Sequence, residues 1–321
     1  MSRQLDRATW RQSGAALLLA MLTVTLVAGF AASALWQQWQ ALEIETAERS
    51  RMQASWVLTG ASDWARLILT EDARTGGPDH LSEPWAAVFQ ETRLSSLLAA
   101  EKNSGATSAG APDGSLSGGI QDMQARLNVI NLKDGEKISE PDLMAFTRLF
   151  TLLGLPQSEL LLLAENLGVS STLAGAAPVA ASMPLNPQHL RELAWLGLSR
   201  TTLSRLAPYV SVLPVRSAVN LNTASAEVIY ASVPGLDMAQ ARSLVDARSR
   251  SPFGSLEDAR RLAGTAAPRI TEGRHSVGTR FFEVRGRLRL DKLVVEERSL
   301  MQREGVDVKT LWREKAAFDA P

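Results

Sequence analysis

The stretch SGAALLLAMLTVTLVAGFAASAL, residues 13–35, decides how the rest of the chain is organised. No charged residue occurs between Arg11 and Glu43. The apolar run Ala15–Leu35 has 21 residues. At about 1.5 Å per helical residue it would be roughly 30 Å long, which is the thickness of the hydrocarbon core of a bilayer. The run therefore predicts a transmembrane helix.

The residues that flank this run predict its orientation. Three arginines and one aspartate precede it, so we expect the basic N-terminal flank to stay in the cytoplasm. Trp36 and Trp39 follow it, where an aromatic belt would lie at the far interface. The rest of the chain is then outside the cytoplasm. The side chains expected to lie in the membrane are Leu17, Leu18, Leu19, Leu22, Leu26, Phe30 and Leu35.

Three interpretations of this N-terminal stretch remain open. A cleaved secretory signal has a shorter apolar region, although Ala32-Ser33-Ala34 resembles its cleavage site. A plain signal anchor would keep the whole segment. In the third interpretation Gly14 stands directly before the apolar run and behind a basic leader, which resembles the prepilin class. In that class a dedicated peptidase would cut after Gly14 and leave Ala15 as an N-methylated terminus.

The composition excludes several kinds of chemistry. Lys+Arg and Asp+Glu both total 34, so no net charge attracts nucleic acid or anionic lipid to the whole chain. The chain has no cysteine, which excludes disulfides and thiolate zinc sites. Its three histidines lie far apart in the sequence, and the sequence holds no P-loop, G-x-S-x-G or G-x-G-x-x-G motif. We therefore expect a protein that is not an enzyme.

Beyond the membrane segment, good helix formers continue without a proline until Pro78. Met52, Trp56, Gly60, Trp64 and Ile68 recur every four residues, which indicates one apolar helix face. A single helix from Ala15 to about Thr70 is one prediction. An anchor followed by a separate amphipathic helix fits the same periodicity.

The next part of the chain is predicted to be mixed in structure. We expect a short helix from Glu83-Pro84-Trp85 to about Leu98, and a surface loop over the Ser/Gly-rich residues 103–119. Alternation over Met123–Val129 predicts a strand with one buried face. Helices are then expected at 140–153, 158–167, 189–194 and 200–206, with a linker at 175–187.

A helix-hairpin-helix pattern follows, with its turn at Pro234-Gly235-Leu236. Thr223 is the expected N-cap of the first helix. The DNA-binding version of this turn has a second glycine, where this chain has Asp237. Residues 220–264 carry five arginines and five carboxylates, whereas phosphate contacts need a basic surface. The pattern therefore favours a protein-facing or structural hairpin over a DNA-binding one.

The C-terminal part returns to strands. Residues 282–290, 294–301 and 306–312 alternate in the manner of three antiparallel strands. The apolar face of such a sheet needs a cover, and we expect Trp56 and Trp64 to supply it. The strand near Leu127 is expected to join the same sheet, so that the helical block is an insertion into an α/β domain.

Five segments, in this order and spacing, carry a resemblance over nearly the whole chain. It resembles general secretion pathway protein K, the large minor pseudopilin of bacterial type II secretion systems. The segments are residues 11–18 (RQSGAALL), 122–128 (DMQARLN), 220–228 (NLNTASAEV), 234–236 (PGL) and 282–286 (FEVRG). The resemblance implies an α+β fold, with a long N-terminal transmembrane helix on an α/β pseudopilin domain with an antiparallel sheet. A large all-helical insertion with helix-hairpin-helix-like units interrupts that domain.

The predicted boundaries follow from this fold. Residues 1–14 are a basic prepilin leader, and 15–70 form the transmembrane and periplasmic helix. Residues 71–135 and 268–316 form the discontinuous pseudopilin domain, and 136–267 form the inserted helical domain. The resemblance places the chain in a bacterial inner membrane, with the N-terminus cytoplasmic and the C-terminal domain periplasmic.

The resemblance also implies a function. A minor pseudopilin of this kind would initiate or cap the pseudopilus with the I and J components and support protein export across the outer membrane. Prepilin peptidase would process it, and secreted substrates could contact the insertion. Ordinary prepilins have Glu as the fifth mature residue, and here that residue is Leu19. A subunit without this Glu lacks the charge partner for docking beneath another subunit.

Two points remain open at this stage. Some members of the family bind calcium in the α/β domain, and Asp113, Asp122 and Asp134 are the nearest acidic residues, but their spacing defines no site. The sequence thus predicts no definite cofactor. The alternative function is a membrane-anchored helix-hairpin-helix protein that handles DNA during uptake.

Overall fold

The structure is a computed structural model that describes residues 13–94, 96, 114–135, 137–172, 186–290 and 293–319. The chain divides into two compact units, residues 1–56 and 57–321. The described strands, and the helices after the first, belong to the second unit. The predictions for residues 103–113 and for residues 175–185 of the linker lie outside the described residues.

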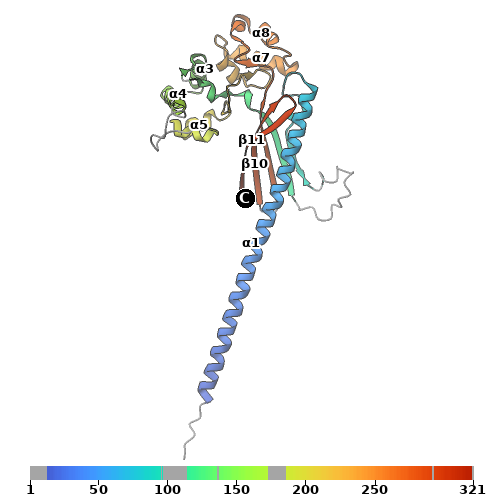
Figure 1. Cartoon of the computed structure of the whole chain (residues 1–321), viewed down its shortest axis with the longest axis vertical. Helices are drawn as coiled ribbons and strands as arrows, with labels where there is room; N and C mark the ends of the chain where they lie inside the picture. Colours follow the sequence, from blue (N-terminus) through green and yellow to red (C-terminus); the bar gives the residue numbers. More distant parts are fainter. Residues whose placement is uncertain are drawn as a thin grey trace, which may run out of the picture. The chain divides into compact units, whose positions relative to one another are not determined.

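The first helix, α1, is one continuous element over Ser13–Thr75 (Figure 1). This confirms the single long helix and rules out an anchor with a separate amphipathic helix. α1 contains no proline, and it ends where Gly76 and Gly77 take positive φ values of 68° and 117°.

A five-stranded antiparallel sheet has the strand order β1-β2-β9-β10-β11. The three C-terminal strands confirm the prediction from the alternating pattern. The strands are β1 (Phe89–Arg93), β2 (Gly114–Asp122), β9 (Phe281–Leu290), β10 (Leu293–Glu304) and β11 (Asp307–Asp319). β1 and β11 are therefore the two edges of the sheet.

The first two strands correct two predictions. The helix expected from residue 84 is only the 3₁₀ turn η1 (Pro84–Ala86), and the chain then enters β1. Residues 114–119, expected in a loop, begin β2. The glycines that suggested a loop let β2 lie close to β9, because a Cβ atom on Gly114 would stand 2.6 Å from the carbonyl oxygen of Arg289.

The residues 123–129 also differ from the prediction. They form the 3₁₀ turn η2 (Met123–Ala125), the two-residue strand β3 (Leu127–Asn128) and the start of η3 (Val129–Leu132). β3 pairs in parallel with β6 (Val210–Ser211) and not with the large sheet. The alternating apolar residues of 123–129 reflect burial in the helical region, because Leu127 and Val129 belong to the apolar core of that region.

The face of α1 that packs on the sheet is not the tryptophan face. Leu58, Ala65 and Leu69 are buried against the sheet, whereas Trp56 and Trp64 are 78% and 57% exposed. The expected tryptophan cover is therefore wrong. The helix approaches the sheet closely at Gly286, because a Cβ atom on that residue would lie 3.0 Å from the Leu58 side chain.

The chain between β2 and β9 is mostly helical. It also contains two small pairs of strands, β4 (Lys133–Asp134) with β5 (Lys137–Ile138) and β7 (Val219–Asn220) with β8 (His275–Ser276). Its helices are α3 (Glu140–Leu152), α4 (Gln157–Thr172), η4 (Leu190–Leu196), α5 (Arg200–Leu206), α6 (Ala226–Ser232), α7 (Met238–Arg250), α8 (Leu256–Leu262) and η5 (Gly264–Arg269).

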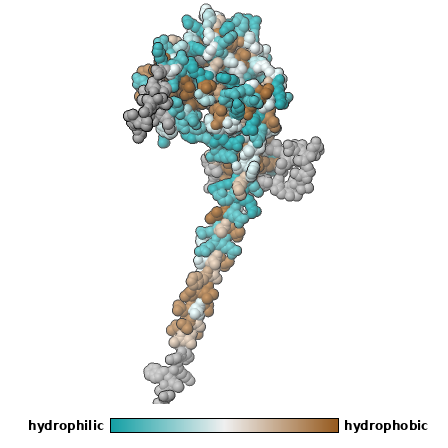
Figure 2. Space-filling view, in the orientation of Figure 1, coloured by the Kyte–Doolittle hydropathy of each residue, from teal (hydrophilic) through white to brown (hydrophobic). Residues whose placement is uncertain are grey.

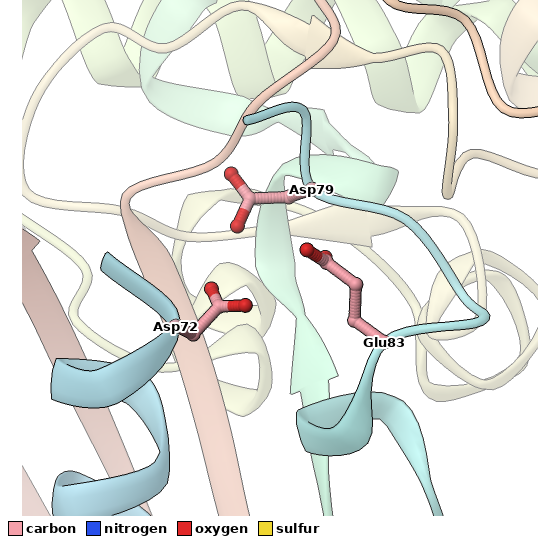
Figure 3. A group of neighbouring side chains, drawn as sticks. All are labelled: Asp72, Asp79 and Glu83. Carbon is pink, nitrogen blue, oxygen red and sulfur yellow. The ribbon is translucent and has the colours of Figure 1, made fainter. Parts of the chain in front are cut away.

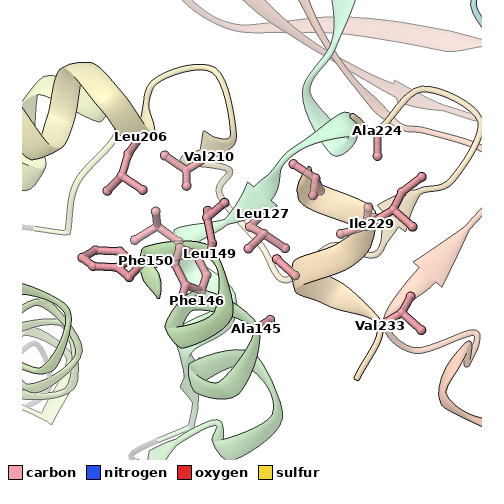
Figure 4. Close-up of a cluster of buried hydrophobic side chains, with 14 of the residues drawn as sticks. Leu127, Ala145, Phe146, Leu149, Phe150, Leu206, Val210, Ala224, Ile229 and Val233 are labelled. Atoms are coloured by element: carbon pink, nitrogen blue, oxygen red, sulfur yellow. The ribbon is translucent and has the colours of Figure 1, made fainter. Parts of the chain in front are cut away.

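One apolar core holds this helical region together (Figure 4). Phe146, Leu149 and Phe150 of α3 point into it, as the spacing of apolar residues in the sequence predicts. Ile229 and Val233 enter it from α6 and the turn that follows.

Candidate functional sites: the apolar helix, an acidic cluster and the helical hairpin

The N-terminal part of α1 is an apolar surface (Figure 2). Within the described part of the chain, α1 is the helix that is long and apolar enough to cross a membrane. The seven predicted membrane side chains between Leu17 and Leu35 are 52–70% exposed. A helix this apolar and this exposed fits a single-pass membrane anchor.

The predicted processing site lies at the start of the same helix. Gly14 and Ala15 are in the first turn of α1, and residues 1–12 of the leader lie outside the described residues. Cleavage after Gly14 therefore stays a prediction. Leu19, which takes the place of the usual glutamate, is 64% exposed.

An acidic cluster lies where α1 ends and the following segment turns back (Figure 3). Carboxylate oxygens of Asp72, Asp79 and Glu83 lie within 4.8 Å of one another. Arg303 of β10 donates to Asp72 at 2.5 Å and to Asp79 at 2.5 and 2.7 Å. The indole of Trp85 donates to Glu83 at 2.7 Å. A guanidinium group therefore already neutralises part of the cluster.

Burial affects the protonation of Asp79 and Asp72. It raises the pKa of Asp79 above its usual value, against the opposing effects of the Thr279 amide and Arg303. Burial and then the charge of Glu83 raise the pKa of Asp72, while Arg303 lowers it. Calcium takes six to eight oxygen ligands, and this cluster offers three carboxylates, two of which already bind Arg303. The donor set fits a structural ion-pair network and not a calcium site.

The residues considered for calcium from the sequence do not form a site. Asp113 lies outside the described residues. Asp134 is exposed in β4, whereas Asp122 is buried and accepts hydrogen bonds from Asn220, Thr223 and the backbone of Gln124. Asp122 has a structural role in joining β2 to the hairpin segment.

The helical hairpin is formed by α6, the turn at Pro234-Gly235-Leu236, and α7. Gly235 has φ 87°, so the turn uses the left-handed conformation that glycine permits, and Leu236 is buried in the core. The N-cap prediction was wrong by two residues. The Ser225 hydroxyl accepts from the amide of Val228, and the Thr223 hydroxyl instead donates to Asp122 at 2.5 Å.

The turn presents a carboxylate in place of a phosphate-binding amide. Asp237 caps α7 by accepting from the amide of Gln240 at 2.7 Å, and the Gln240 side chain accepts from the amide of Asp237. Because these amides are occupied within the helix, the DNA-handling alternative is not favoured.

The segment Asn220–Ala224 explains the most regular motif in the sequence. Asn220 donates to Asp122 at 2.9 Å and to the backbone of Asp79 at 3.1 Å, so it joins the hairpin to the acidic cluster. Arg248 of α7 is buried and donates to the carbonyl of Leu221, and its burial lowers its pKa to about 10. The sequence could not reveal this network, because its members come from distant segments.

Three comparisons with known proteins agree with this architecture. A family model described as type II secretion system protein K matches residues 219–278. The type II secretion system protein K of Pseudomonas aeruginosa is 28% identical over 325 residues, covering 95% of this chain and 90% of the relative. That of Klebsiella pneumoniae is 29% identical over 329 residues, covering 92% and 94%.

The fold also matches a solved structure. The crystal structure of the GspK-GspI-GspJ complex from the enterotoxigenic Escherichia coli type 2 secretion system contains a chain that aligns with a TM-score of 0.61. The alignment has 19% identity and covers 84% of this chain and 98% of the other. These comparisons confirm the resemblance of this chain to the type II secretion system protein K family.

Proposed function

We propose that this chain is a non-enzymatic minor pseudopilin of a type II secretion system, which initiates or caps the pseudopilus tip and supports protein export across the outer membrane. One observation carries the proposal. A continuous helix with an apolar N-terminal half packs on an antiparallel sheet, and a helical region interrupts the chain between two strands of that sheet. The agreement with protein K relatives over more than 90% of the chain supports it.

The proposed parts of the chain follow the predicted boundaries. Residues 1–14 are a leader that prepilin peptidase removes, and 15–70 anchor the protein in the inner membrane and continue into the periplasm. Residues 71–135 and 268–316 form the pseudopilin domain, and 136–267 form the insertion. The pairing of β2 with β9 supports this division, because these two strands are adjacent in the sheet although the helical region separates them in sequence.

The proposed partners are the I and J minor pseudopilins. The similar chain in the E. coli structure is found in a complex of GspK, GspI and GspJ. Leu19 supports a position at the tip, because a subunit without the usual glutamate lacks the partner for a neighbour's N-terminal amine within the membrane. The bulky insertion would obstruct growth beyond this subunit and would face secreted substrates.

The test is the intact mass and N-terminal sequence of the full chain, expressed with and without a prepilin peptidase. We expect loss of residues 1–14 and methylation of Ala15 only when the peptidase is present. A bulky substitution, Gly14→Val, should block cleavage, whereas Leu19→Glu is a matched control that should leave processing intact.

Two outcomes would contradict the proposal. Cleavage near Ala34 would identify a secretory signal, and no cleavage in either strain would identify a plain anchor. Loss of processing in Leu19→Glu would show that the peptidase reads this position and would remove the interpretation of Leu19 as a tip feature.

A further inference from the structure

The face of the sheet opposite α1 carries a row of arginines. Phe282 and Val284 of β9 face α1, so the alternate residues Arg285, Arg287 and Arg289 lie on the other face. Arg298 of β10 is the direct cross-strand neighbour of Arg285. The Arg285 and Arg298 side chains are 43% and 49% exposed, so solvent and partners can reach them.

Two of the arginines on this face share one carboxylate. Glu283 is buried and forms ion pairs with Arg285 and, at 2.8 Å, with Arg298. Arg126, which enters from the segment after η2, donates to the amide oxygen of Gln121 at 3.2 Å. Within the described ranges no carboxylate lies within ion-pair distance of Arg126. Glu283 is thus the carboxylate at ion-pair distance for Arg285 and Arg298, and Arg126 has none at that distance among the described residues.

The remaining carboxylates on this face are engaged elsewhere. Glu314 is opposite Arg298 across the strands, but it binds Arg191 at 2.6 Å and His189 at 3.2 Å. Glu296 lies 3.4 Å from Arg287, one row away, and Glu91 of β1 accepts a hydrogen bond from Ser115, the cross-strand neighbour of Arg289. These pairs leave the excess charge concentrated around Arg126, Arg285 and Arg298. We name these three residues the arginine cluster.

The arginine cluster is unfavourable for the isolated protein. Like charges directly across a strand pair destabilise a sheet. Burial, together with Arg285 and Arg298, lowers the pKa of Arg126, although Glu283 and Asp122 oppose this effect. Coulombic interactions are also stronger at a partly buried group than in bulk water, so the same arrangement favours an added anion. A guanidinium fork is matched to a carboxylate, which it can bind through two parallel hydrogen bonds.

We propose that the arginine cluster is a docking site for an extended acidic segment of a partner protein, with one carboxylate between Arg126, Arg285 and Arg298. Same-face side chains of an extended strand are about 7 Å apart. A segment with alternating carboxylates would therefore also reach Arg287 and Arg289 along β9. Glu283, Glu296 and Glu314 lie on the same face and repel any anion, so a segment whose carboxylates are spaced apart fits better than a continuous phosphate backbone. The site goes beyond the proposed place in a pseudopilus and does not depend on it.

The test measures fluorescence anisotropy of a labelled peptide of about ten residues that alternates Glu and Thr, titrated with the full chain in detergent micelles. We expect binding that weakens steeply between about 0.05 and 0.3 M salt. The triple variant Arg126→Gln, Arg285→Gln, Arg298→Gln should bind at least about tenfold more weakly. The matched control is Arg242→Gln on α7, an exposed arginine outside this face, which should leave binding unchanged.

A single variant keeps the test decisive if the triple variant fails to fold. Arg126→Gln leaves both ion pairs of Glu283 in place, and circular dichroism should show an unchanged fold with binding reduced about threefold. The proposal is overturned if the wild type does not bind the peptide, if the Gln–Thr peptide of equal length binds as well, or if Arg126→Gln binds like the wild type. Displacement of the peptide by a short DNA duplex at lower concentration would identify a nucleic-acid surface instead.

Discussion

The helical region and the contact between α1 and the sheet are stabilised in different ways. The core of the helical region consists of apolar side chains, among them those of α3 and α6 (Figure 4) and those of α4, η4 and α7. The contact between α1 and the sheet is smaller, and among apolar residues it also buries the charged Glu297. The Ser62 hydroxyl of α1 donates to Glu297 at 2.7 Å, and Arg313 and Lys315 of β11 each lie 3.2 Å from its carboxylate.

This difference shows how each region obtains its specificity. Apolar burial is non-directional and roughly proportional to the area removed from water, so the helical region depends on volume and shape. A buried carboxylate is costly without hydrogen-bonded partners, so we expect the contact of Ser62 with Glu297 to favour the observed register of α1 on the sheet. We therefore expect substitutions in the two regions to have separable effects.

The largest effect is expected for Phe146→Ala in α3. Phe146 is 2% exposed, and replacing a buried phenylalanine by alanine lowers the free energy of unfolding by about 3–5 kcal/mol. Hydrogen exchange of the full chain should show this loss at the amides of α3 and α6. Met144→Ala, at a residue that is 53% exposed on the same helix, is the control and should have little effect. An equal loss of protection in β9 would show that the two regions unfold together.

The next effect concerns pH at the junction of the two regions. His275 in β8 is 1% exposed, and burial, followed by the charge of Arg274, lowers its pKa from 6.5 to about 4. The unfolded chain then binds the proton more tightly than the folded chain. The contribution of neutral His275 to the free energy of unfolding is therefore complete above pH 6.5 and is lost as the pH falls towards 4. The shift corresponds to about 3 kcal/mol.

The measurement is chemical unfolding of the full chain at several pH values, with His275→Asn as the comparison. The asparagine oxygen can accept from the Thr271 amide as Nδ1 does at 3.2 Å, but it does not titrate. Wild type should lose about 3 kcal/mol more than the variant between neutral pH and pH 4. Parallel pH profiles would assign the acid sensitivity to other groups.

The smallest effect is expected for Trp64→Ala. Trp64 is 57% exposed and its ring centroid lies 6.2 Å from that of Phe89. The loss of unfolding free energy should be less than about 1 kcal/mol, because an exposed aromatic pair contributes little. Leu69→Ala, on the buried face of the same helix, should cost about 2–5 kcal/mol. Equal losses in the two variants would support the prediction from the sequence that Trp64 covers the sheet.

Regular periodicity was sufficient to predict much of the fold. The apolar run of α1, the stripe that includes Phe146 and Phe150, and the alternation in β9 each report on one element and its own buried face. The turn at Pro234-Gly235-Leu236 was also predicted, because glycine and proline have strong local preferences.

Features that depend on contacts between distant segments were missed. The glycines of β2 are needed because β9 approaches closely, so the strand has the composition of a loop. Both faces of α1 carry apolar residues, and only the sheet determines that Leu58 and not Trp64 is buried. The acidic cluster joins Asp72, Asp79 and Glu83 to Arg303 of a late strand, which no local pattern indicates.

The position of β11 at an edge of the sheet has a consequence for solubility. A strand of 13 residues at an edge could pair with strands of other molecules and seed aggregates. Charged side chains, among them Lys309, Arg313 and Lys315, interrupt the apolar residues of this strand, and natural proteins use such charges to blunt an exposed edge. When many copies gather at high local concentration, these charges would help to keep the sheet of each molecule from fusing with the next.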